Sequence, residues 1–290
     1  MKKIKVGIIG TGNIGCDLLK KVLRSKYLEC GIFTGQNPDS NGIKFAKKLG
    51  IKTSYSSIDA IIKKPSLCDI VFDATSANAH KKHAPILKKM GKFVVDLTPS
   101  RVGKMCIPSI NMNDCLNEKN INMVTCGGQA TVPIIKAITD IYPEINYVEI
   151  VGSISSKSAG IETRNNIDEY TQTTSVAIEK MAKIPKAKAI IILNPAEPPI
   201  TMHNTIYVQV KKPDLKLVTK SVNDMAKKIR RYAPGFKIST EPIFDGNKIT
   251  LMIDVLGAGD FLPPYAGNLD IINSAAITAA ETYAKKKLLY

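Results

Sequence analysis

Ile4-Lys-Val-Gly-Ile-Ile-Gly-Thr-Gly-Asn-Ile-Gly15 opens the sequence with an apolar run that leads directly into a glycine-rich turn. The apolar half predicts a buried strand, and the apolar spacing of Cys16–Leu23 predicts a helix after the turn. In such a strand–turn–helix unit Gly10 permits the tight turn, Gly12 lets the backbone approach a pyrophosphate and Gly15 lets helix and strand pack closely. The stretch therefore predicts a dinucleotide-binding domain.

Strand-like and helix-like segments alternate after this unit, which is typical of an α/β fold with a doubly wound parallel sheet. The further predicted strands are Tyr27–Thr34, Asp69–Ala74, Lys92–Leu97 and Asn122–Thr125. The predicted helices between them are Ile43–Leu49, Ser57–Lys63 and Ala79–Met90. We expect this first domain to cover residues 1–125.

The pattern changes after residue 125, where longer strand-like segments predict a second domain, 126–267, with a mixed or antiparallel sheet. Its predicted strands are Tyr147–Ile154, Ala187–Leu193, Thr205–Val210 and Lys248–Val255, and its predicted helices are Ile167–Met181 and Leu215–Arg231. The C-terminal segment 268–290 predicts a last helix whose small residues allow tight packing. We expect this helix to pack back on the first domain.

Composition narrows the class of protein. The net charge of +16 comes from lysines spread over nearly every predicted helix, with no basic stripe interleaved with aromatic residues, so no nucleic-acid partner is expected. No apolar run reaches the length of a membrane span and the N-terminus leads into a strand, so neither a membrane contact nor a signal peptide is expected. The six cysteines lack C-x-x-C spacing, which predicts reduced thiols in a cytoplasmic protein.

No metal site is predicted. His80 and His83 lie three residues apart in a predicted helix, but two histidines need further ligands to hold a metal ion. We expect both histidines to lie on a solvated helix face.

One cysteine, Cys126, lies in a segment that favours a reactive thiol, Met123-Val-Thr-Cys126-Gly-Gly-Gln-Ala-Thr-Val-Pro133. We expect Thr131 to cap a helix and Pro133 to lie in its first turn, which would place the thiol at the positive end of the helix dipole and favour the thiolate. Gly127 and Gly128 can offer N–H groups to an oxyanion. A buried structural thiol is the alternative. The dinucleotide fingerprint earlier in the chain favours the nucleophile.

With these residues in view, the chain resembles the acylating acetaldehyde dehydrogenases, which partner 4-hydroxy-2-oxovalerate aldolases in the meta-cleavage pathways of aromatic hydrocarbon catabolism. The resemblance covers nearly the whole length. It rests on the segments Gly10–Gly15, Phe72–Ser76, Asp96–Pro99, Asn122–Thr131, Ser155–Gly160, Thr163–Glu169, Leu193–Pro199 and Tyr265–Asp270. It implies a Rossmann-type sheet and an α+β catalytic and dimerisation domain of the semialdehyde-dehydrogenase type.

The resemblance also implies an activity: a short aldehyde, acetaldehyde above all, is oxidised with NAD and coenzyme A to an acyl-CoA. By position, Cys126 is then the nucleophile that forms the acyl thioester. Implied cofactor-binding residues are Gly10, Thr11, Gly12, Asn13, Ile14 and Gly15 around the phosphates, and Ser156, Lys157, Ser158, Ala159, Gly160, Thr163, Arg164 and Asn268 toward the nicotinamide. A homodimer and an aldolase partner are implied as well.

Four places depart from the family's pattern. Asn204, next to His203, stands where the family has an aspartate that is a candidate for polarising the thiol. Asn37 follows the second strand where the family has an aspartate near the adenosine ribose, so NADP is admitted beside NAD. The pair at 161–162 replaces Pro-Gly, and the region 240–248 is shorter. These changes bear on the substrate, the cofactor and the partner.

Two alternatives stay open. Phosphorylating dehydrogenases of the semialdehyde type share this architecture, but they rely on a histidine base and on arginines, whereas this chain has three histidines and a single arginine, Arg164, in a matched motif. The second alternative is a nucleotide-binding subunit that has lost catalysis, as the changes at Asn204 and 161–162 would allow. The retained Cys126-Gly-Gly argues against it.

Overall fold

Two units of the chain each build their own sheet in the structure, a computed structural model that describes residues 3–289. The first unit contains the described residues up to Met123 and those from Asn273 onward, and the second contains Val124–Ile272. The ends of the predicted domains at residues 1 and 290 lie outside the described residues.

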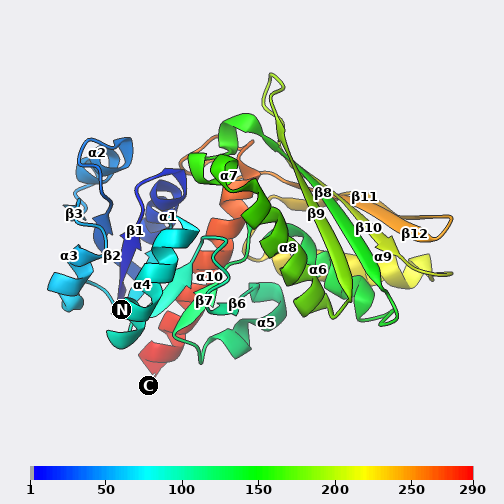
Figure 1. Cartoon of the computed structure of the whole chain (residues 1–290), viewed down its shortest axis with the longest axis horizontal. Coiled ribbons are helices and arrows are strands. Elements are labelled where there is room, and N and C mark those ends of the chain that lie inside the picture. Colours follow the sequence, from blue (N-terminus) through cyan, green and yellow to red (C-terminus); the bar gives the residue numbers. More distant parts are fainter. Residues whose placement is uncertain (1–2, 290) are drawn as a thin grey trace. The chain divides into compact units, whose positions relative to one another are not determined.

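The first unit is built on a seven-stranded, fully parallel sheet with the strand order β3-β2-β1-β4-β5-β7-β6 (Figure 1). Its strands are β1 (Ile4–Ile9), β2 (Leu28–Thr34), β3 (Thr53–Ser54), β4 (Ile70–Asp73), β5 (Phe93–Asp96), β6 (Lys104–Met105) and β7 (Asn120–Asn122). Its helices are α1 (Asn13–Arg24), α2 (Asn41–Lys48), α3 (Asp59–Lys63), the short η1 (Pro65–Leu67), α4 (Ala77–Lys89), α5 (Pro108–Cys115) and the later part of α10 (Gly267–Leu289). The order reverses between β1 and β4, as in doubly wound nucleotide-binding sheets.

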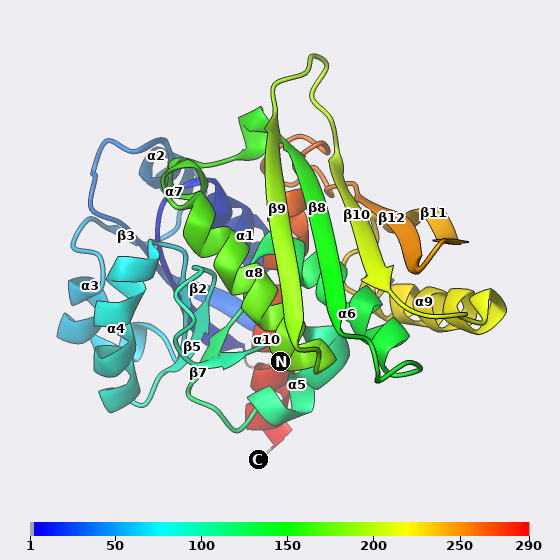
Figure 2. The ribbon, with the colours of Figure 1, turned by 45° about the vertical axis from the view of Figure 1, so that its right-hand side comes forward.

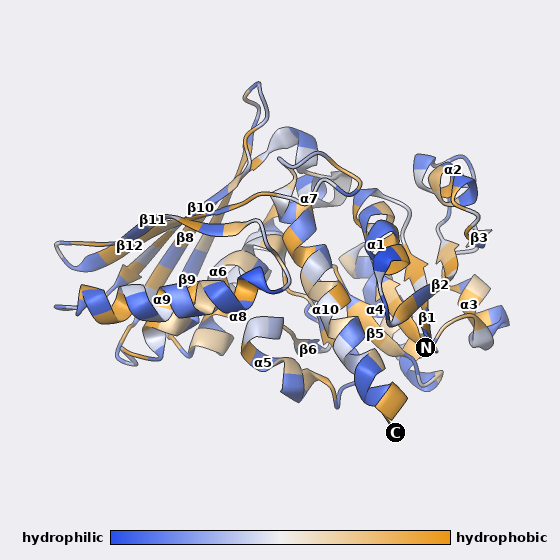
Figure 3. Cartoon of the chain, turned by 180° about the vertical axis from the view of Figure 1, so that it is seen from behind, coloured by the Kyte–Doolittle hydropathy of each residue, from blue (hydrophilic) through white to orange (hydrophobic). Residues whose placement is uncertain are grey.

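The core of this unit consists of strands that are buried on both faces. Every residue of β4 and β5 is buried, as expected for parallel strands covered by helices on both sides. Figure 3 shows β1, β2 and β5 largely in the colour of hydrophobic residues. Within the same unit, the ring of Tyr283 on α10 stacks on Phe93 with ring centroids 3.9 Å apart, and Ala275 and Ala279 are fully buried.

The second unit contains a five-stranded mixed sheet with the order β11-β12-β10-β8-β9, which is antiparallel except for the parallel pair β8–β9. Its strands are β8 (Tyr147–Ser155), β9 (Lys186–Asn194), β10 (Met202–Gln209), β11 (Phe236–Asp245) and β12 (Lys248–Val255). Its helices are α6 (Cys126–Thr139), the short η2 (Ser156–Ser158), α7 (Ile161–Asn165), α8 (Ile167–Ala182) and α9 (Leu215–Arg230). Figure 2 shows β9, β8 and β10 side by side with α6 behind them.

Burial alternates along β8 and β12, so one face of this sheet is buried and the other remains half-exposed. Val148 and Ile150 lie on the buried face, whereas Tyr147, Glu149 and Val151 lie on the open one. The open face has a depression of about 420 Å³ lined by Tyr147, Tyr207 and Lys248 among others. This open face therefore carries both polar and apolar side chains, and none of the described helices of this unit covers it.

The region 240–248, which is shorter than in the family that the sequence resembles, consists of the second half of β11, a two-residue turn at 246–247 and the first residue of β12, and Gly246 in the turn takes a φ of 63°. None of the described helices is both long and apolar enough to cross a membrane.

Candidate active site

Cys126 is the first residue of helix α6, and the helix is capped by Thr125. The Thr125 hydroxyl accepts a hydrogen bond from the Gly128 N–H at 2.9 Å. The prediction that Thr131 caps this helix is therefore wrong: Thr131 lies inside it and donates to the Gly127 carbonyl at 2.7 Å. Pro133 likewise lies inside the helix rather than in its first turn. The shift places the thiol on the first turn, closer to the helix end than the sequence pattern indicated.

The backbone before the nucleophile is strained. Val124 has a φ of 64°, in the left-handed region that a β-branched residue rarely adopts. A Cβ on Gly128 would lie 2.7 Å from the Val124 side chain, so glycine is needed there for close packing. Strain of this kind costs about 1–3 kcal/mol and gathers at functional sites, where the surrounding structure holds it in place.

Tyr170, in the first turns of α8, is the side chain that contacts the thiol. Its hydroxyl lies 3.4 Å from Cys126 Sγ and accepts a hydrogen bond from the Gly127 N–H at 3.0 Å. Both Cys126 and Tyr170 remain half-exposed, so a small substrate can reach them. Sequence reasoning missed Tyr170, although the matched segment Thr163–Glu169 ends one residue before it.

Two expectations about this loop meet opposing features in the structure. Burial raises the pKa of the Cys126 thiol, and the hydrogen bonds with Tyr170 and the Gly127 N–H offset that rise only in part, so the thiol does not have the lowered pKa expected of its helix position. The N–H groups of Gly127 and Gly128, expected to serve an oxyanion, are already bonded to Tyr170 and Thr125. In this structure neither of these two N–H groups is available to an oxyanion.

The turn predicted to hold the cofactor phosphates has the required backbone. Gly10 takes a φ of +113°, and a Cβ on Gly15 would lie 1.9 Å from the Gly10 carbonyl oxygen. Gly12, by contrast, has nothing within 4 Å of the place where a Cβ would be. Helix α1 begins at Asn13 with no side-chain cap and no acidic residue in its first turn. Its N–H groups and dipole fit a pyrophosphate, and the open space beside Gly12 leaves room for one. Thr11 lies in the same turn and accepts from the Ser40 hydroxyl at 3.1 Å.

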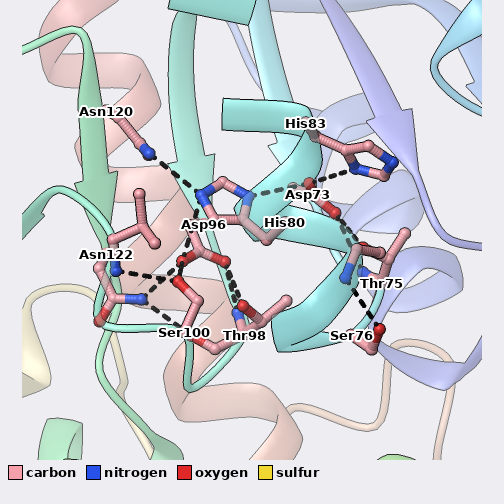
Figure 4. Close-up of polar contacts among 12 residues, drawn as sticks. Asp73, Thr75, Ser76, His80, His83, Asp96, Thr98, Ser100, Asn120 and Asn122 are labelled. Carbon is pink, nitrogen blue, oxygen red and sulfur yellow. Dashed lines mark hydrogen bonds and ion pairs between the residues drawn. The ribbon is translucent and has the colours of Figure 1, made fainter. Parts of the chain in front are cut away.

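A buried polar network lies at the ends of β4, β5 and β7 (Figure 4). His80 Nδ1 and His83 Nδ1 lie 2.9 and 2.8 Å from Asp73 Oδ2. The expectation that both histidines face solvent is therefore wrong: His80 is 0% and His83 8% exposed, because α4 turns them onto the carboxylate that ends β4. The His80 Nε2 atom lies 3.4 Å from Asp96 and 3.0 Å from the Asn120 amide.

The network repeats one local motif. Asp73 and Asp96 each accept hydrogen bonds from both the N–H and the hydroxyl of the threonine two residues later, Thr75 and Thr98. Asp96 also accepts from the Asn122 amide at 2.7 Å. These bonds fix the loops that leave β4 and β5. Within residues 3–289 no group of three or more histidines, cysteines and carboxylates has the arrangement of a metal site.

Burial and charge act against each other in this network. Burial alone would raise the pKa of Asp73, but the hydrogen bonds from His80 and His83 hold it well below its ordinary value. Burial would lower the pKa of His80, but the bond to Asp73 and the charge of Asp96 raise it above its usual value. The pKa of Asp96 is raised because its burial outweighs the attraction of His80.

The segment predicted to approach the nicotinamide is held together by Arg164. Its guanidinium donates to the Ser156 carbonyl and hydroxyl at 2.6 and 2.9 Å, and to the Ala159 carbonyl at 3.3 Å. The structure also brings Asn268 to this segment, where its amide donates to the Ser158 carbonyl at 3.5 Å. The buried Oδ1 of Asn268 has no partner among the described residues and can accept from an amide such as that of nicotinamide. The remaining predicted residues of the segment are Lys157, which pairs with Glu197 at the surface, Gly160 and Thr163.

Asn204 and His203 are neighbours on β10 and point to opposite faces of the sheet. Asn204 is fully buried, and neither polar atom of its amide hydrogen-bonds a described residue. His203 Nδ1 lies 2.6 Å from Asp254. Neither side chain therefore hydrogen-bonds Cys126 in this structure. In the first unit, Asn37 lies exposed after β2 and its Oδ1 accepts from the Asp39 N–H at 2.9 Å.

Comparison with known proteins places this site in a family. Residues 5–115 match the family described as "Semialdehyde dehydrogenase, NAD binding domain", and residues 126–263 match "Prokaryotic acetaldehyde dehydrogenase, dimerisation". An acetaldehyde dehydrogenase from Geobacillus stearothermophilus is 52% identical over 290 residues, which cover 99% of this chain and 98% of that relative. The chain belongs to the acetaldehyde dehydrogenase family. A second member, from Carboxydothermus hydrogenoformans, is 53% identical over 286 residues, 99% of this chain and 95% of its own.

Solved structures bear out the fold. An aspartate semialdehyde dehydrogenase from Candida albicans, solved with NADP, has a TM-score of 0.68 at 11% identity and covers 97% of this chain and 100% of its own. An aspartate semialdehyde dehydrogenase II from Vibrio cholerae has a TM-score of 0.62 at 15% identity, with 99% of each chain covered. The resemblance seen in the sequence is confirmed, and the chain is an aldehyde dehydrogenase with a domain for a nicotinamide cofactor.

Proposed function

We propose that this aldehyde dehydrogenase converts a short aldehyde, acetaldehyde above all, to an acyl-CoA through a thioester on Cys126. The observation that carries the proposal is the half-exposed thiol at the first residue of α6, 3.4 Å from the Tyr170 hydroxyl. Four of the other cysteines are buried, and burial raises the pKa of the fifth, Cys30, to about 12. Acetaldehyde enters the proposal through the relatives, which are named acetaldehyde dehydrogenases.

The chemistry follows from the thiolate. Cys126 Sγ forms a bond to the carbonyl carbon, and the π electron pair of the carbonyl moves onto its oxygen. When bound, an oxidised nicotinamide accepts the hydride, with both electrons of the C–H bond, which leaves a thioester on the cysteine. The thiolate of coenzyme A then attacks the acyl carbon, and the C–S bond to Cys126 breaks to return the thiolate. One proton is released for each aldehyde oxidised.

The proposed cofactor contacts are those implied by the sequence. The backbone of Gly10–Gly15 would hold the pyrophosphate, as the uncapped start of α1 and the open space at Gly12 support. The segment 156–164 and Asn268 would hold the nicotinamide, and the unpartnered Oδ1 of Asn268 supports this. Asn37 after β2 is neutral and would not repel the 2′-phosphate of NADP, so the site can accept NADP as well as NAD.

Coenzyme A is favoured over phosphate as the acyl acceptor. A phosphorylating enzyme of this architecture is expected to use a histidine base at the thiol, but the three histidines of this chain bond elsewhere. His80 and His83 bond Asp73, and His203 bonds Asp254. A subunit without catalysis is disfavoured because the loop at Cys126 keeps its strained backbone and its hydrogen-bonded thiol.

The remaining parts of the proposal concern assembly and location. The match to a dimerisation domain and the half-exposed open face of the second sheet support a homodimer. An aldolase partner is proposed from the resemblance alone. None of the six cysteines forms a disulfide within the described residues, and this supports a cytoplasmic location.

The test is direct. Mass spectrometry of enzyme mixed with acetaldehyde and NAD, without coenzyme A, should show an acetyl adduct on the Cys126 peptide, and adding coenzyme A should remove it as acetyl-CoA. Cys126→Ala should form no adduct and no NADH. An adduct on another cysteine, release by phosphate in place of coenzyme A, or full activity in Cys126→Ala would each contradict the proposal.

A further inference from the structure

The hydroxyl of Tyr170 contacts the reacting sulfur and the helix end that carries it. We propose that Tyr170 is a catalytic residue, whose hydroxyl donates a hydrogen bond first to the Cys126 thiolate and then to the alkoxide that forms when the thiolate attacks the aldehyde. This role rests on the proposed function of Cys126. It supplies the oxyanion donor that Gly127 and Gly128 cannot supply, because their N–H groups are engaged.

The hydrogen bonds around Tyr170 fix where its proton can go. The Thr174 hydroxyl donates to the Tyr170 carbonyl at 2.8 Å, so Thr174 must accept the bond of 2.8 Å that joins it to Thr125. Thr125 has then used its only proton, and it also accepts from the Gly128 N–H. Since the Gly127 N–H donates to the Tyr170 oxygen and Thr125 has no proton left to donate, Cys126 Sγ is the acceptor that the described residues offer to the phenol proton.

This arrangement lets the phenol proton of Tyr170 be donated to a different atom at each step of the reaction. Beside the neutral thiol, the Tyr170 oxygen can accept from the S–H group as well as from the Gly127 N–H. Beside the thiolate, it donates to sulfur, a charge-assisted bond that is stronger than a neutral one. Once sulfur is bonded to carbon it becomes a thioether and a weak acceptor, so the phenol proton is released to the new alkoxide on the adjacent carbon. The phenol itself stays protonated throughout, because burial raises the pKa of Tyr170 well above its ordinary value.

The space next to Gly127 independently supports this position of the Tyr170 hydroxyl. A Cβ added at Gly127 would lie 2.4 Å from the Tyr170 oxygen, and the next two nearest atoms outside the helix backbone belong to the Tyr170 ring. Gly127 lies in the helix, where alanine is favoured over glycine by about 1 kcal/mol. The need for glycine at this position therefore comes from the tyrosine.

The first experiment measures the pH dependence of Cys126 alkylation by iodoacetamide in the full chain. Tyr170→Phe removes the donor and should shift the midpoint upward by about one pH unit, since a hydrogen bond to a charged group of about 1.5 kcal/mol corresponds to that shift. The burst of NADH formed with acetaldehyde and NAD at neutral pH should fall about tenfold for the same reason. Tyr142→Phe is the matched control: it removes a tyrosine hydroxyl after the far end of α6, where Tyr142 accepts from the Asp214 N–H, and should leave both measurements unchanged.

The second experiment displaces the hydroxyl without removing it. Gly127→Ala should reproduce the upward shift of the alkylation midpoint, because its methyl group pushes the Tyr170 hydroxyl away from sulfur. In the Tyr170→Phe background the same alanine should have almost no further effect, since the atom it displaces is gone. This non-additivity is the signature of a direct interaction, and thermal unfolding of each variant checks that the fold is retained.

The outcomes separate this role from the proposed function. An unchanged midpoint and an unchanged NADH burst in Tyr170→Phe would overturn the role of Tyr170 while leaving Cys126 as the nucleophile. Additive effects of Gly127→Ala and Tyr170→Phe would also overturn it. If Tyr170→Phe failed to fold, the midpoint of Gly127→Ala alone would decide. A failure of the proposed function appears differently, as acyl transfer that persists in Cys126→Ala.

Discussion

Asn204 offers a sharp test of the physical account of the second unit. Its side chain is 0% exposed on the buried face of β10, and neither its Nδ2 nor its Oδ1 hydrogen-bonds a described residue. A buried polar group left without a partner costs about 1–3 kcal/mol. Asn204→Leu keeps the branch at Cγ and removes both polar atoms. We therefore expect it to stabilise the protein by about 1–2 kcal/mol, which raises the unfolding midpoint by about 2–8 °C in a domain of this size.

Asn204→Asp should do the opposite in a pH-dependent way. A buried carboxylate without a partner costs several kcal/mol, so the folded protein should hold the introduced carboxyl protonated and raise its pKa above the ordinary value of about 3.9. An acid whose pKa is raised by folding contributes stability below its unfolded pKa, and that stability is lost as pH rises. The unfolding midpoint of Asn204→Asp should thus fall relative to wild type between about pH 4 and pH 7.

Thermal unfolding followed by circular dichroism measures both effects, and Asn273→Leu is the matched control. Asn273 is also 0% exposed, but its amide donates to the Ile14 carbonyl and to Asp17. Its replacement should therefore lower the midpoint, whereas Asn204→Leu raises it. A lower midpoint for Asn204→Leu would refute the reasoning, because it would mean that the amide is satisfied by a bound partner. NADH formation by Asn204→Leu then tests whether the polar group serves the substrate at the expense of stability.

Three further outcomes are expected. Gly12→Val should abolish NAD binding, measured by calorimetry, in a protein that stays folded because a Cβ there meets nothing within 4 Å, whereas Gly15→Ala should destabilise the fold because its Cβ would lie 1.9 Å from a carbonyl oxygen. Asn37→Asp should raise the ratio of kcat/KM for NAD over NADP, since the new charge repels a 2′-phosphate; an unchanged ratio would mean that position 37 lies outside the ribose site. Asp73→Asn should cost about 3–5 kcal/mol at neutral pH because it breaks a buried ion pair with His80 and weakens the hydrogen bond to His83. Folding lowers the pKa of Asp73, so its contribution is present above about pH 4 and the gap to wild type should close as the pH falls further.

Local patterns in the sequence were enough to predict most of the first sheet. Ile4–Gly15 carries its own strand, turn and helix start, so it needs no distant contact to be recognised. Lys248–Val255 was predicted with its observed bounds because its apolar residues alternate regularly. Strand β11, in contrast, was not predicted. It lies at the edge of the sheet and its exposed residues include Lys237 and Glu241, so it lacks a hydrophobic pattern.

The errors at the site come from contacts between residues distant in sequence. His80 and His83 have the spacing of a polar helix face, and only the carboxylate of Asp73 at the end of β4 makes their burial favourable. Cys126 was found from its neighbours, but the partner of its sulfur is 44 residues away. A tyrosine within a helix has no local feature that distinguishes a catalytic hydroxyl from a packing residue.

The surroundings of Cys126 suit a thiol that must both attack and leave. A thiolate stabilised strongly by charge is a weaker nucleophile, because nucleophilicity falls as the pKa of the thiol falls. Burial raises the pKa of Cys126, so its thiolate retains high nucleophilicity toward the aldehyde. The same property makes it a poor leaving group when coenzyme A attacks the thioester. A neutral hydrogen-bond donor suits both steps. The Tyr170 hydroxyl can donate to sulfur again as the C–S bond breaks, which assists the departure of the thiolate. A fixed cation would assist departure too, but it would also lower the reactivity of the free thiolate. On this account the neutral hydroxyl of Tyr170, and not a carboxylate at position 204, assists acyl transfer between the two thiols in both directions.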